Sequence, residues 1–147
     1  MAMKALVTGS TGFVGAAVSR CLLERGVDVR VLVRRDSDLR NLEGLKVEQA
    51  YGDLRDTGSL RQALASCRHL YHVAALYALW APDPQIFYDT NVTGTRNLME
   101  AALDSGADEL AGLPAMHALQ RRQVNVLAFR LDVGHLSPHH PGIPGAA

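Results

Sequence analysis

Three regularly spaced glycines are the strongest chemical signal in the sequence. Gly9, Gly12 and Gly15 follow one another at three-residue intervals, between a short apolar run and a segment with helical periodicity. Gly9 would permit a tight turn, Gly12 would let the backbone approach a pyrophosphate, and Gly15 would let a helix pack closely on a sheet. The free N–H groups and positive dipole at the helix N-terminus suit a diphosphate. In this context the glycines predict nucleotide binding; the alternative is a purely structural turn.

Charged residues further along the chain bear on the choice of nucleotide. About twenty residues after such a turn, an acidic side chain binds the ribose 2′-hydroxyl, whereas an arginine favours a 2′-phosphate. This sequence has Arg34 and Arg35 at that point, followed directly by Asp36. We therefore expect NADP(H) to be favoured over NAD(H). The alternative is a solvated loop that carries paired charges.

Alternating strands and helices must position these residues. Apolar or alternating runs predict strands at 4–8, 27–33, 47–51 and 69–75, with a loop and room for one helical turn at 34–44. Helices are predicted at 13–25, at 57–66 after an N-cap at Asp56, and from Pro84 to Ser105, with Gly26 and Gly106 beyond the ends of the first and last. This alternation predicts an α/β fold with a doubly wound parallel sheet.

The composition is close to that of an average globular protein. The 147 residues fit one domain, 48% of them are hydrophobic, and 15 Lys and Arg balance 15 Asp and Glu. This balance gives no electrostatic case for nucleic acid as a partner, and no apolar run reaches the roughly 18 residues of a membrane span. Cys21 and Cys67 form no disulfide framework, and the N-terminus has no signal-peptide pattern. We expect a soluble, cytoplasmic protein.

Four motifs, taken as a set, are similar to those of a known family. They are the glycine pattern at 8–15, the turn Gly52-Asp53-Leu54, the sequence HVAA at 72–75 and the sequence NVTGTRNL at 91–98. Together they resemble the extended short-chain dehydrogenase/reductases, which include NAD-dependent epimerases and dehydratases. The segment LYALWAPDP at 76–84 looks closest to hopanoid-associated sugar epimerases and dihydroflavonol-reductase-like proteins. The resemblance extends from Met3 to about Gly106.

The resemblance implies a set of residues that bind an NAD(P) dinucleotide. The pyrophosphate would lie against the glycine turn, Arg34 would contact the adenosine phosphate, and Asp53 with Leu54 would contact the adenine. Residues 73–75 would line the cofactor or simply pack the strand; Asn91 would face the nicotinamide or bond to backbone inside its helix. The full set is Gly9, Thr11, Gly12, Phe13, Val14, Gly15, Arg34, Asp53, Leu54, Val73, Ala74, Ala75 and Asn91.

The sequence departs from the family in its catalytic residues. The resemblance implies a Ser or Thr after the fifth strand and a Tyr-x-x-x-Lys pair, in which the lysine lowers the pKa of the tyrosine so that it can transfer protons. The only lysines are Lys4 and Lys46, and every tyrosine comes after Lys46. No such pair can occur, so we expect no catalytic residue and no hydride transfer by this chain alone.

The sequence after Gly106 departs from the family as well. Residues 107–114 carry helix and turn signals where an apolar fifth strand is expected, whereas VNVLAFRL at 124–131 predicts a strand. We therefore expect a Rossmann-like domain over 1–106, truncated after the fourth strand, and an atypical, partly disordered tail over 107–147.

Two further expectations concern this tail and the strand before it. If the fourth strand ends the sheet, its exposed edge would favour self-association, unless 124–131 covers it. Residues 115–123 predict a short helix. His135, His139 and His140 are not expected to bind metal, because no Cys or carboxylate cluster accompanies them.

Three functions are consistent with this sequence. The first is the NAD(P)-binding portion of a reductase or nucleotide-sugar epimerase/dehydratase, without catalytic residues of its own. The second is a non-catalytic dinucleotide-binding module that acts as a sensor or binds a partner. The third is a remnant that binds nothing. Dinucleotide binding by the purified chain separates the third from the other two.

Overall fold

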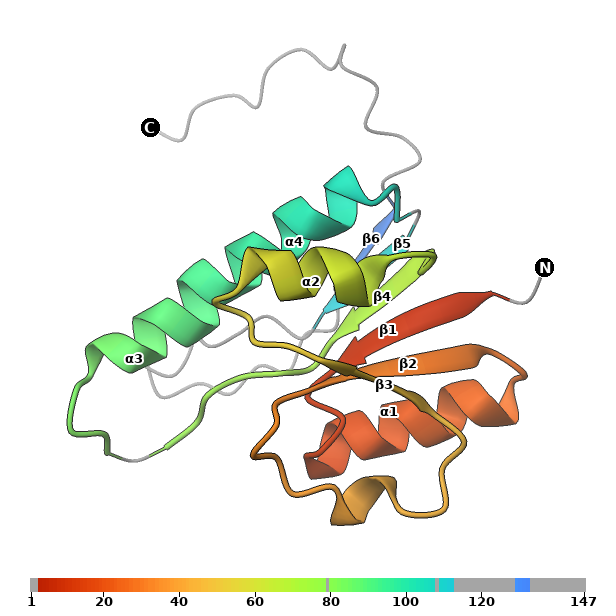
Figure 1. The fold of residues 1–147 in the computed structure, drawn as a ribbon, viewed down its shortest axis with the longest axis horizontal. Helices are drawn as coiled ribbons and strands as arrows, with labels where there is room; N and C mark the ends of the chain where they lie inside the picture. Colours follow the sequence, from red (N-terminus) through yellow and green to blue (C-terminus); the bar gives the residue numbers. More distant parts are fainter. Residues whose placement is uncertain (1–2, 79, 108, 113–128, 133–147) are drawn as a thin grey trace, which may run out of the picture.

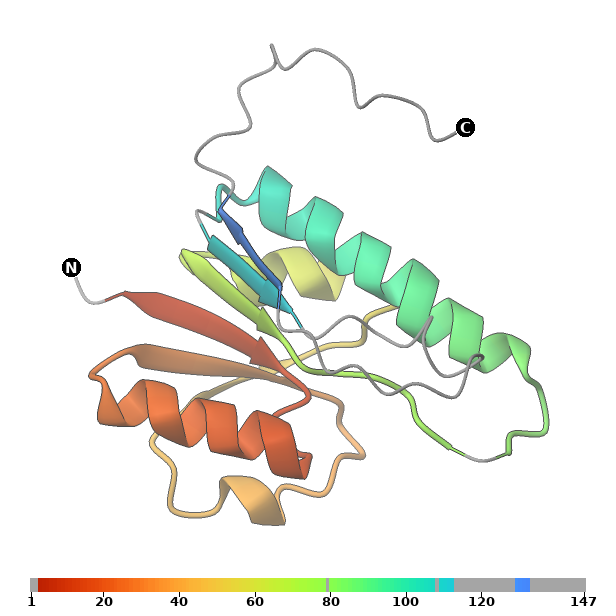
Figure 2. The ribbon, with the colours of Figure 1, turned by 180° about the vertical axis from the view of Figure 1, so that it is seen from behind.

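The computed structural model describes residues 3–78, 80–107, 109–112 and 129–132, which form a six-stranded sheet with helices on both faces (Figures 1 and 2). The strand order is β3-β2-β1-β4-β5-β6, and every neighbouring pair is parallel except β5 and β6. The expected doubly wound parallel sheet is confirmed. The strands are β1 (Lys4–Thr8), β2 (Asp28–Val33), β3 (Glu48–Tyr51), β4 (His69–His72), β5 (Glu109–Gly112) and β6 (Phe129–Asp132).

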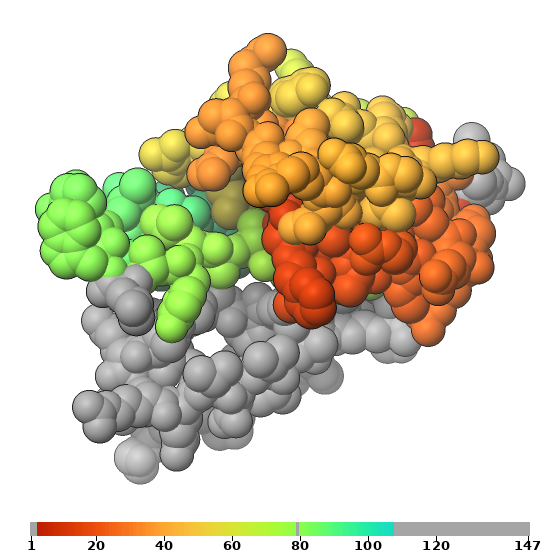
Figure 3. Space-filling model, turned by 90° about the horizontal axis from the view of Figure 1, so that it is seen from below, coloured from red at the N-terminus to blue at the C-terminus, as the bar shows by residue number. Residues whose placement is uncertain are grey.

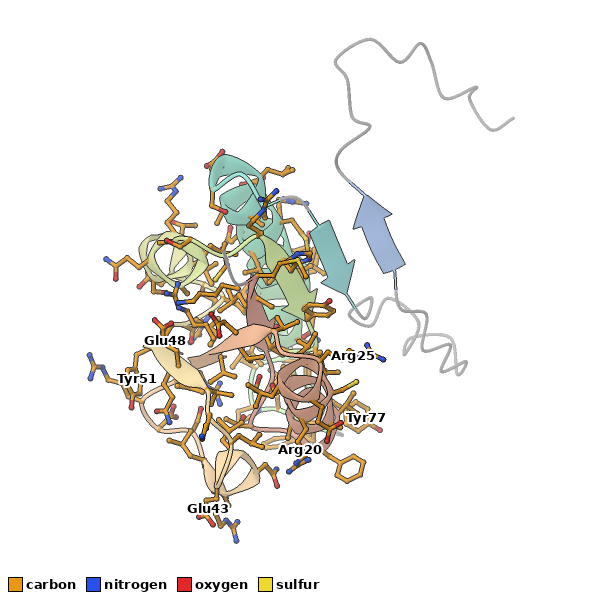
Figure 4. The ribbon with its side chains drawn as sticks, turned by 90° about the vertical axis from the view of Figure 1, so that its right-hand side faces the viewer. Arg20, Arg25, Glu43, Glu48, Tyr51 and Tyr77 are labelled. Atoms are coloured by element: carbon orange, nitrogen blue, oxygen red, sulfur yellow. The ribbon has the colours of Figure 1, made fainter. Side chains whose placement is uncertain are left out.

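Helices cover the two faces of the sheet unequally. Helix α1 lies on one face, and α2 and α4 lie side by side on the other (Figures 1 and 4). A 3-10 turn, η1, follows β2, and a π-helical segment, η2, separates the short α3 from α4. Their bounds are α1 (Phe13–Glu24), η1 (Arg40–Leu42), α2 (Thr57–Leu64), α3 (Gln85–Tyr88), η2 (Asp89–Thr93) and α4 (Gly94–Asp104).

Two apolar clusters hold these layers together. On the α1 face, Ala5 and Val7 of β1 pack in one cluster with Leu22 of α1. On the other face, Leu6 packs in a second cluster with residues such as Leu98 of α4. Because side chains alternate along a strand, the apolar run of β1 supplies both clusters, as expected of a buried parallel strand.

The helix boundaries follow local signals in the sequence. The Asp56 side chain accepts hydrogen bonds from the backbone N–H groups of Gly58 (3.0 Å) and Ser59 (3.3 Å), so it is the N-cap of α2. Helix α2 ends at Leu64, before the predicted residue 66, because Ala65 leaves the helical conformation with a ψ of 124°; Ser66 after it has a positive φ of 65°. The helix predicted from Pro84 to Ser105 is present as α3, η2 and α4, with a π-helical interruption that the sequence did not predict.

The sheet does not end at the fourth strand, which corrects the expectation of truncation at that point. Residues 109–112 form β5, which pairs in parallel with β4, and β6 pairs with β5. Strand β4 is therefore internal, so the expected reason for self-association, an exposed β4 edge, is absent. No strand was predicted within residues 107–114 because a four-residue strand that begins with Glu and ends with Gly gives no apolar run. This segment is a strand because it pairs with β4.

Other expectations for the tail lie outside the described residues. These are the helix at 115–123, the first part of the strand at 124–131, and the histidines at 135, 139 and 140. Within the described part of the chain, no helix has the length and apolar character needed to cross a membrane.

Candidate functional site

The glycine turn joins β1 to α1 and brings the backbone of both very close together. Gly9 has a φ of +73°, and a Cβ there would lie 2.6 Å from the backbone nitrogen of Ala74. A Cβ at Gly15 would overlap the carbonyl group of Gly9. At Gly12, by contrast, a Cβ would meet only the Gly9 carbonyl oxygen, at 3.4 Å. The first and third glycines thus shape the turn, and the second leaves its outer side open.

A cavity of about 740 Å³ opens beside this turn, at the carboxyl ends of β1, β2 and β4. In Figure 3 the red glycine turn, the orange loop after β2 and the yellow-green segment after β4 lie together on the visible face. Twelve of the thirteen predicted binding residues line this one cavity: Gly9, Thr11, Gly12, Phe13, Val14, Gly15, Arg34, Asp53, Leu54, Val73, Ala74 and Ala75.

The loop after β2 separates the two neighbouring arginines. Arg34 lines the cavity, and its Nε lies 3.7 Å from Asp36, with both side chains largely exposed. Such an exposed pair holds the arginine only weakly. Because 60% of its side chain is exposed, the Arg34 guanidinium remains accessible to a ligand. The Arg35 guanidinium instead lies over the Tyr51 ring, 5.5 Å from its centroid. Asn41 of η1 ties this loop to the glycine turn by donating to the Thr11 carbonyl oxygen at 2.7 Å.

Asp53 at the end of the cavity is an ionised carboxylate paired with Arg55. Arg55 Nε and Nη2 each donate to the carboxylate at 2.9 Å, and the Arg55 backbone N–H donates at the same distance. These hydrogen bonds, mainly those of the Arg55 side chain, lower the pKa of Asp53 to about 2. The carboxylate is thus charged at neutral pH, and Arg55 compensates that charge at the cavity surface.

Asn91 is buried, but it is not among the residues that line the cavity. Its carboxamide accepts from the Leu76 backbone N–H at 2.7 Å and donates to the Leu76 carbonyl oxygen at 2.9 Å. It lies in η2, and π-helical segments often occur at functional sites. The structure therefore places Asn91 behind the cavity wall, bonded to backbone, where it holds Leu76 in place.

Replacing Asn91 with alanine is expected to lower the free energy of unfolding by about 2–4 kcal/mol. The change leaves the N–H and C=O groups of Leu76 without their partner. A buried unsatisfied group costs about 1–3 kcal/mol, and because Leu76 is only partly buried, water keeps the cost of each in the lower part of that range. Urea denaturation of both proteins measures the difference. Asn97→Ala is the matched control, because Asn97 makes one comparable bond, to the Leu54 carbonyl oxygen. Equal losses in the two variants would contradict the double role of Asn91.

Several cavity residues were not predicted from the sequence. Arg55 and Ser37 could have been found, since each lies within three residues of a predicted binding residue. Ile86 of α3 gives no such signal, because it reaches the cavity only through the fold. The unpredicted lining residues are Thr8, Leu32, Ser37, Gly52, Arg55, Leu76, Tyr77, Ile86 and Thr90.

The tyrosines and lysines do not meet at this cavity. Among the residues that line it, Tyr77 is the one tyrosine and there is no lysine. Lys4 lies at the start of β1 and donates to Glu48 at 2.8 Å. Figure 4 shows Tyr51 and Glu48 near the β3 edge, well apart from Tyr77. The described part of the chain therefore brings together no tyrosine–lysine pair at the cavity.

The strand order and the cavity together define a class of protein. The order reverses between β1 and β4, and the cavity lies at the carboxyl ends of these strands beside a glycine turn, which is the arrangement of Rossmann-type nucleotide-binding folds. The model of the NAD dependent epimerase/dehydratase family matches residues 5–113. The chain belongs to this family.

Individual relatives support the same assignment. Sterol demethylase protein B of Methylococcus capsulatus is 42% identical over 140 residues, which cover 95% of this chain and 42% of that protein. A dihydroflavonol 4-reductase-like protein of Synechocystis is 48% identical over 102 residues, 69% of this chain and 29% of that protein. A short-chain dehydrogenase/reductase superfamily protein from Agrobacterium tumefaciens, solved with bound NAD, is 35% identical with a TM-score of 0.63, over 74% of this chain and 31% of that one.

The lengths of these matches carry two further facts. This chain spans less than half of each of the three proteins. The match to the Methylococcus protein covers 95% of this chain, so it must include most of residues 107–147. Similarity to relatives therefore continues past Gly106, where the family resemblance was expected to end.

Proposed function

We propose that this chain binds an NAD(P) dinucleotide and is the cofactor-binding portion of a reductase or nucleotide-sugar epimerase/dehydratase. One observation carries the proposal: segments far apart in the sequence bring twelve predicted binding residues to a single cavity. The volume of about 740 Å³ lies within the range of roughly 300–1,000 Å³ for small-molecule sites. The remaining length of the relatives would supply the substrate-binding part.

The cavity walls suit the parts of a dinucleotide in order. The open side of Gly12 and the N-terminus of α1 would hold the pyrophosphate, because a backbone without Cβ atoms lets the phosphates approach the N–H groups. Asp53 and Leu54 would contact the adenine, and the small side chains at 73–75 would lie beside the nicotinamide. A bound nicotinamide supplies hydride chemistry. The residues of this chain bind and orient it.

Titration of the purified chain with NADPH and NADH by calorimetry tests this proposal. Micromolar binding of either dinucleotide would support it. The absence of binding by both, from a chain that circular dichroism shows to be folded, would contradict it and favour the remnant interpretation. AMP is a useful control ligand, since it carries an adenine but no pyrophosphate bridge.

We further propose that NADP(H) is preferred over NAD(H), on the position of Arg34 at the cavity surface. Arg34→Ala is expected to weaken NADPH binding about tenfold and to leave NADH binding almost unchanged, because a guanidinium forms strong charge-assisted bonds to a 2′-phosphate. Calorimetric titration of both cofactors measures the effect.

Arg35 provides the matched control for Arg34. It is the next residue and carries the same charge, but it lies over the Tyr51 ring and does not line the cavity. Arg35→Ala should therefore leave the NADPH:NADH affinity ratio close to that of wild type. A preference for NADPH that survives Arg34→Ala unchanged would show that Arg34 does not read the phosphate.

The second candidate is a non-catalytic dinucleotide-binding module. It is favoured by the absence of Tyr-x-x-x-Lys from all 147 residues. Without that pair the chain has no tyrosine whose pKa a neighbouring lysine lowers for proton transfer. We infer that the chain alone binds cofactor but does not turn it over. NADPH oxidation by the purified chain, in the presence of ketone or nucleotide-sugar substrates, would contradict this inference.

A further inference from the structure

A row of three polar side chains, two of them buried and the third, Thr95, partly buried, connects α4 to the glycine turn. Thr8 is the last residue of β1, His72 is the last of β4, and each is 1% exposed. The His72 ring bonds to both neighbours, through Nδ1 to Thr8 Oγ1 at 2.7 Å and through Nε2 to Thr95 Oγ1 at 3.0 Å. Strands β1 and β4 are adjacent in the sheet, and α4, which carries Thr95, lies beside α2 on one face of that sheet (Figure 1). The row thus crosses from helix to sheet beside the cavity.

Hydrogen-bond accounting assigns the direction of each bond. The Thr8 hydroxyl oxygen accepts from the backbone N–H of Ala74 at 3.2 Å and from that of Val73 at 3.3 Å, and the Val73 N–H is shared with the Thr8 carbonyl oxygen, also at 3.3 Å. A hydroxyl has one proton and two acceptor positions, so the Thr8 proton is donated to His72 Nδ1. Nδ1 must then be unprotonated, and the single ring proton lies on Nε2, which donates to Thr95. This places His72 in one neutral tautomer.

The same contacts connect the row to the cavity wall. Thr8, Val73 and Ala74 all line the cavity. Ala74 also lies so close to Gly9 that a Cβ on Gly9 would come within 2.6 Å of the Ala74 nitrogen. The oxygen that binds the two N–H groups is therefore one of the contacts that set the distance between the β4 end and the glycine turn.

We propose that His72 is a positioning residue for the dinucleotide cavity: by accepting the Thr8 hydroxyl proton it directs the Thr8 oxygen at the N–H groups of Val73 and Ala74 and fixes that wall against the glycine turn. The proposal rests on the proposed dinucleotide binding. Burial lowers the pKa of His72 to about 4, which agrees with the neutral ring that this geometry requires. His72 touches no substrate or cofactor atom in this role and acts through Thr8.

Two amide substitutions separate the two bonds of the ring. In His72→Asn the amide oxygen occupies a position like that of Nδ1 and can accept from Thr8. In His72→Gln the longer side chain offers its NH₂ near the position of Nε2 and can donate to Thr95. We expect His72→Asn to bind dinucleotide with an affinity within about threefold of wild type. We expect His72→Gln to bind about tenfold more weakly, since it loses the hydrogen bond from the Thr8 hydroxyl.

A second pair of variants tests the same bond from its other end. Thr8→Ser keeps the hydroxyl and Thr8→Val removes it at similar volume, so the first should bind dinucleotide almost normally and the second about tenfold more weakly. This pair keeps the proposal testable if the His72 variants do not fold. Leu60→Val is the control for destabilisation alone, because Leu60 is fully buried on α2 but does not line the cavity. Its affinity should match that of wild type.

Calorimetry with NADPH and NADH, together with amide exchange at Val73 and Ala74, decides the outcome. Faster exchange in His72→Gln than in His72→Asn, with the matching order of affinities, supports the proposal. If the wild-type chain binds dinucleotide and the four His72 and Thr8 variants all bind it equally well, this proposal is overturned while the proposed function stands. If wild type binds neither dinucleotide, the proposed function is wrong and the positioning role falls with it.

Discussion

Replacing Gly15 with alanine is expected to abolish dinucleotide binding and to lower the free energy of unfolding by about 3 kcal/mol. The new Cβ would overlap the carbonyl group of Gly9, and a backbone atom in a tight turn cannot move aside as a flexible side chain can. Overpacking of this kind costs about 1–3 kcal/mol or more even where side chains can adjust. Here α1 must shift away from β1, and the turn that faces the cavity must open.

Two other glycines separate the parts of this effect. Gly44 has a positive φ, +76°, which Gly15 in α1 does not have, and a Cβ there would meet nothing within 4 Å. Gly44→Ala is therefore the control for a glycine replacement without a clash: it costs only backbone strain and should leave dinucleotide binding unchanged. Gly12→Ala adds a methyl group in ordinary contact with Gly9, so it should retain the fold and lose dinucleotide affinity. Urea denaturation and NADPH titration of the three variants measure both quantities. Normal binding by Gly15→Ala would show that the turn is not the pyrophosphate site.

Local interactions explain which features of the fold could be predicted. The Asp56 cap, the positive φ of Gly26 and the glycine turn each depend on a few adjacent residues, so their residue types were sufficient signals. Strand β5 depends on pairing with β4, forty residues earlier in the sequence. A four-residue segment that begins with Glu and ends with Gly gives no local sign of that pairing, so the predicted sheet ended one strand too early.

In the candidate site, too, residues with a local pattern could be predicted and residues brought together by the fold could not. Residues of the glycine turn were found by their pattern, and the structure brings them to the cavity together with Arg34 and Asp53. For Asn91 the sequence left open a contact with the nicotinamide or a backbone bond inside its helix. Its bonds go instead to Leu76, fifteen residues earlier and outside that helix, which the residues around Asn91 could not indicate. The Thr8–His72–Thr95 row joins residues from three distant segments, and nothing in the order of the chain indicates that they meet.

Acidification from pH 7 to pH 4 is expected to cost about 3 kcal/mol of folding free energy through His72 alone. Burial lowers the pKa of this histidine from its ordinary value of 6.5 to about 4, so between these values the unfolded chain binds a proton that the folded chain does not. Each pH unit in this window is worth about 1.4 kcal/mol. The contribution of His72 to the free energy of unfolding is therefore fully present above pH 6.5 and decreases as the pH falls toward 4.

The carboxylates act in a lower pH window. The pKa of Asp53 is held at about 2, against an ordinary value of 3.8, so its pairing with Arg55 is lost only below pH 4. Glu48, which bonds Lys4 and Arg30, also has a lowered pKa, from an ordinary value of 4.5, and contributes at the acidic end. Loss of stability between pH 6.5 and 5 is thus assigned to the buried histidine.

His72→Asn isolates this contribution, because the amide keeps the bond to Thr8 but cannot titrate. Urea denaturation of wild type and variant at pH 7, 6, 5 and 4 should show a steep decline for wild type and a shallow one for the variant. The difference between the two curves should reach about 3 kcal/mol at pH 4, following the two pKa values of His72. Parallel curves would mean that His72 accepts a proton in the folded chain. Its Nδ1 would then not be reserved for the Thr8 hydroxyl, and the assigned tautomer would be wrong.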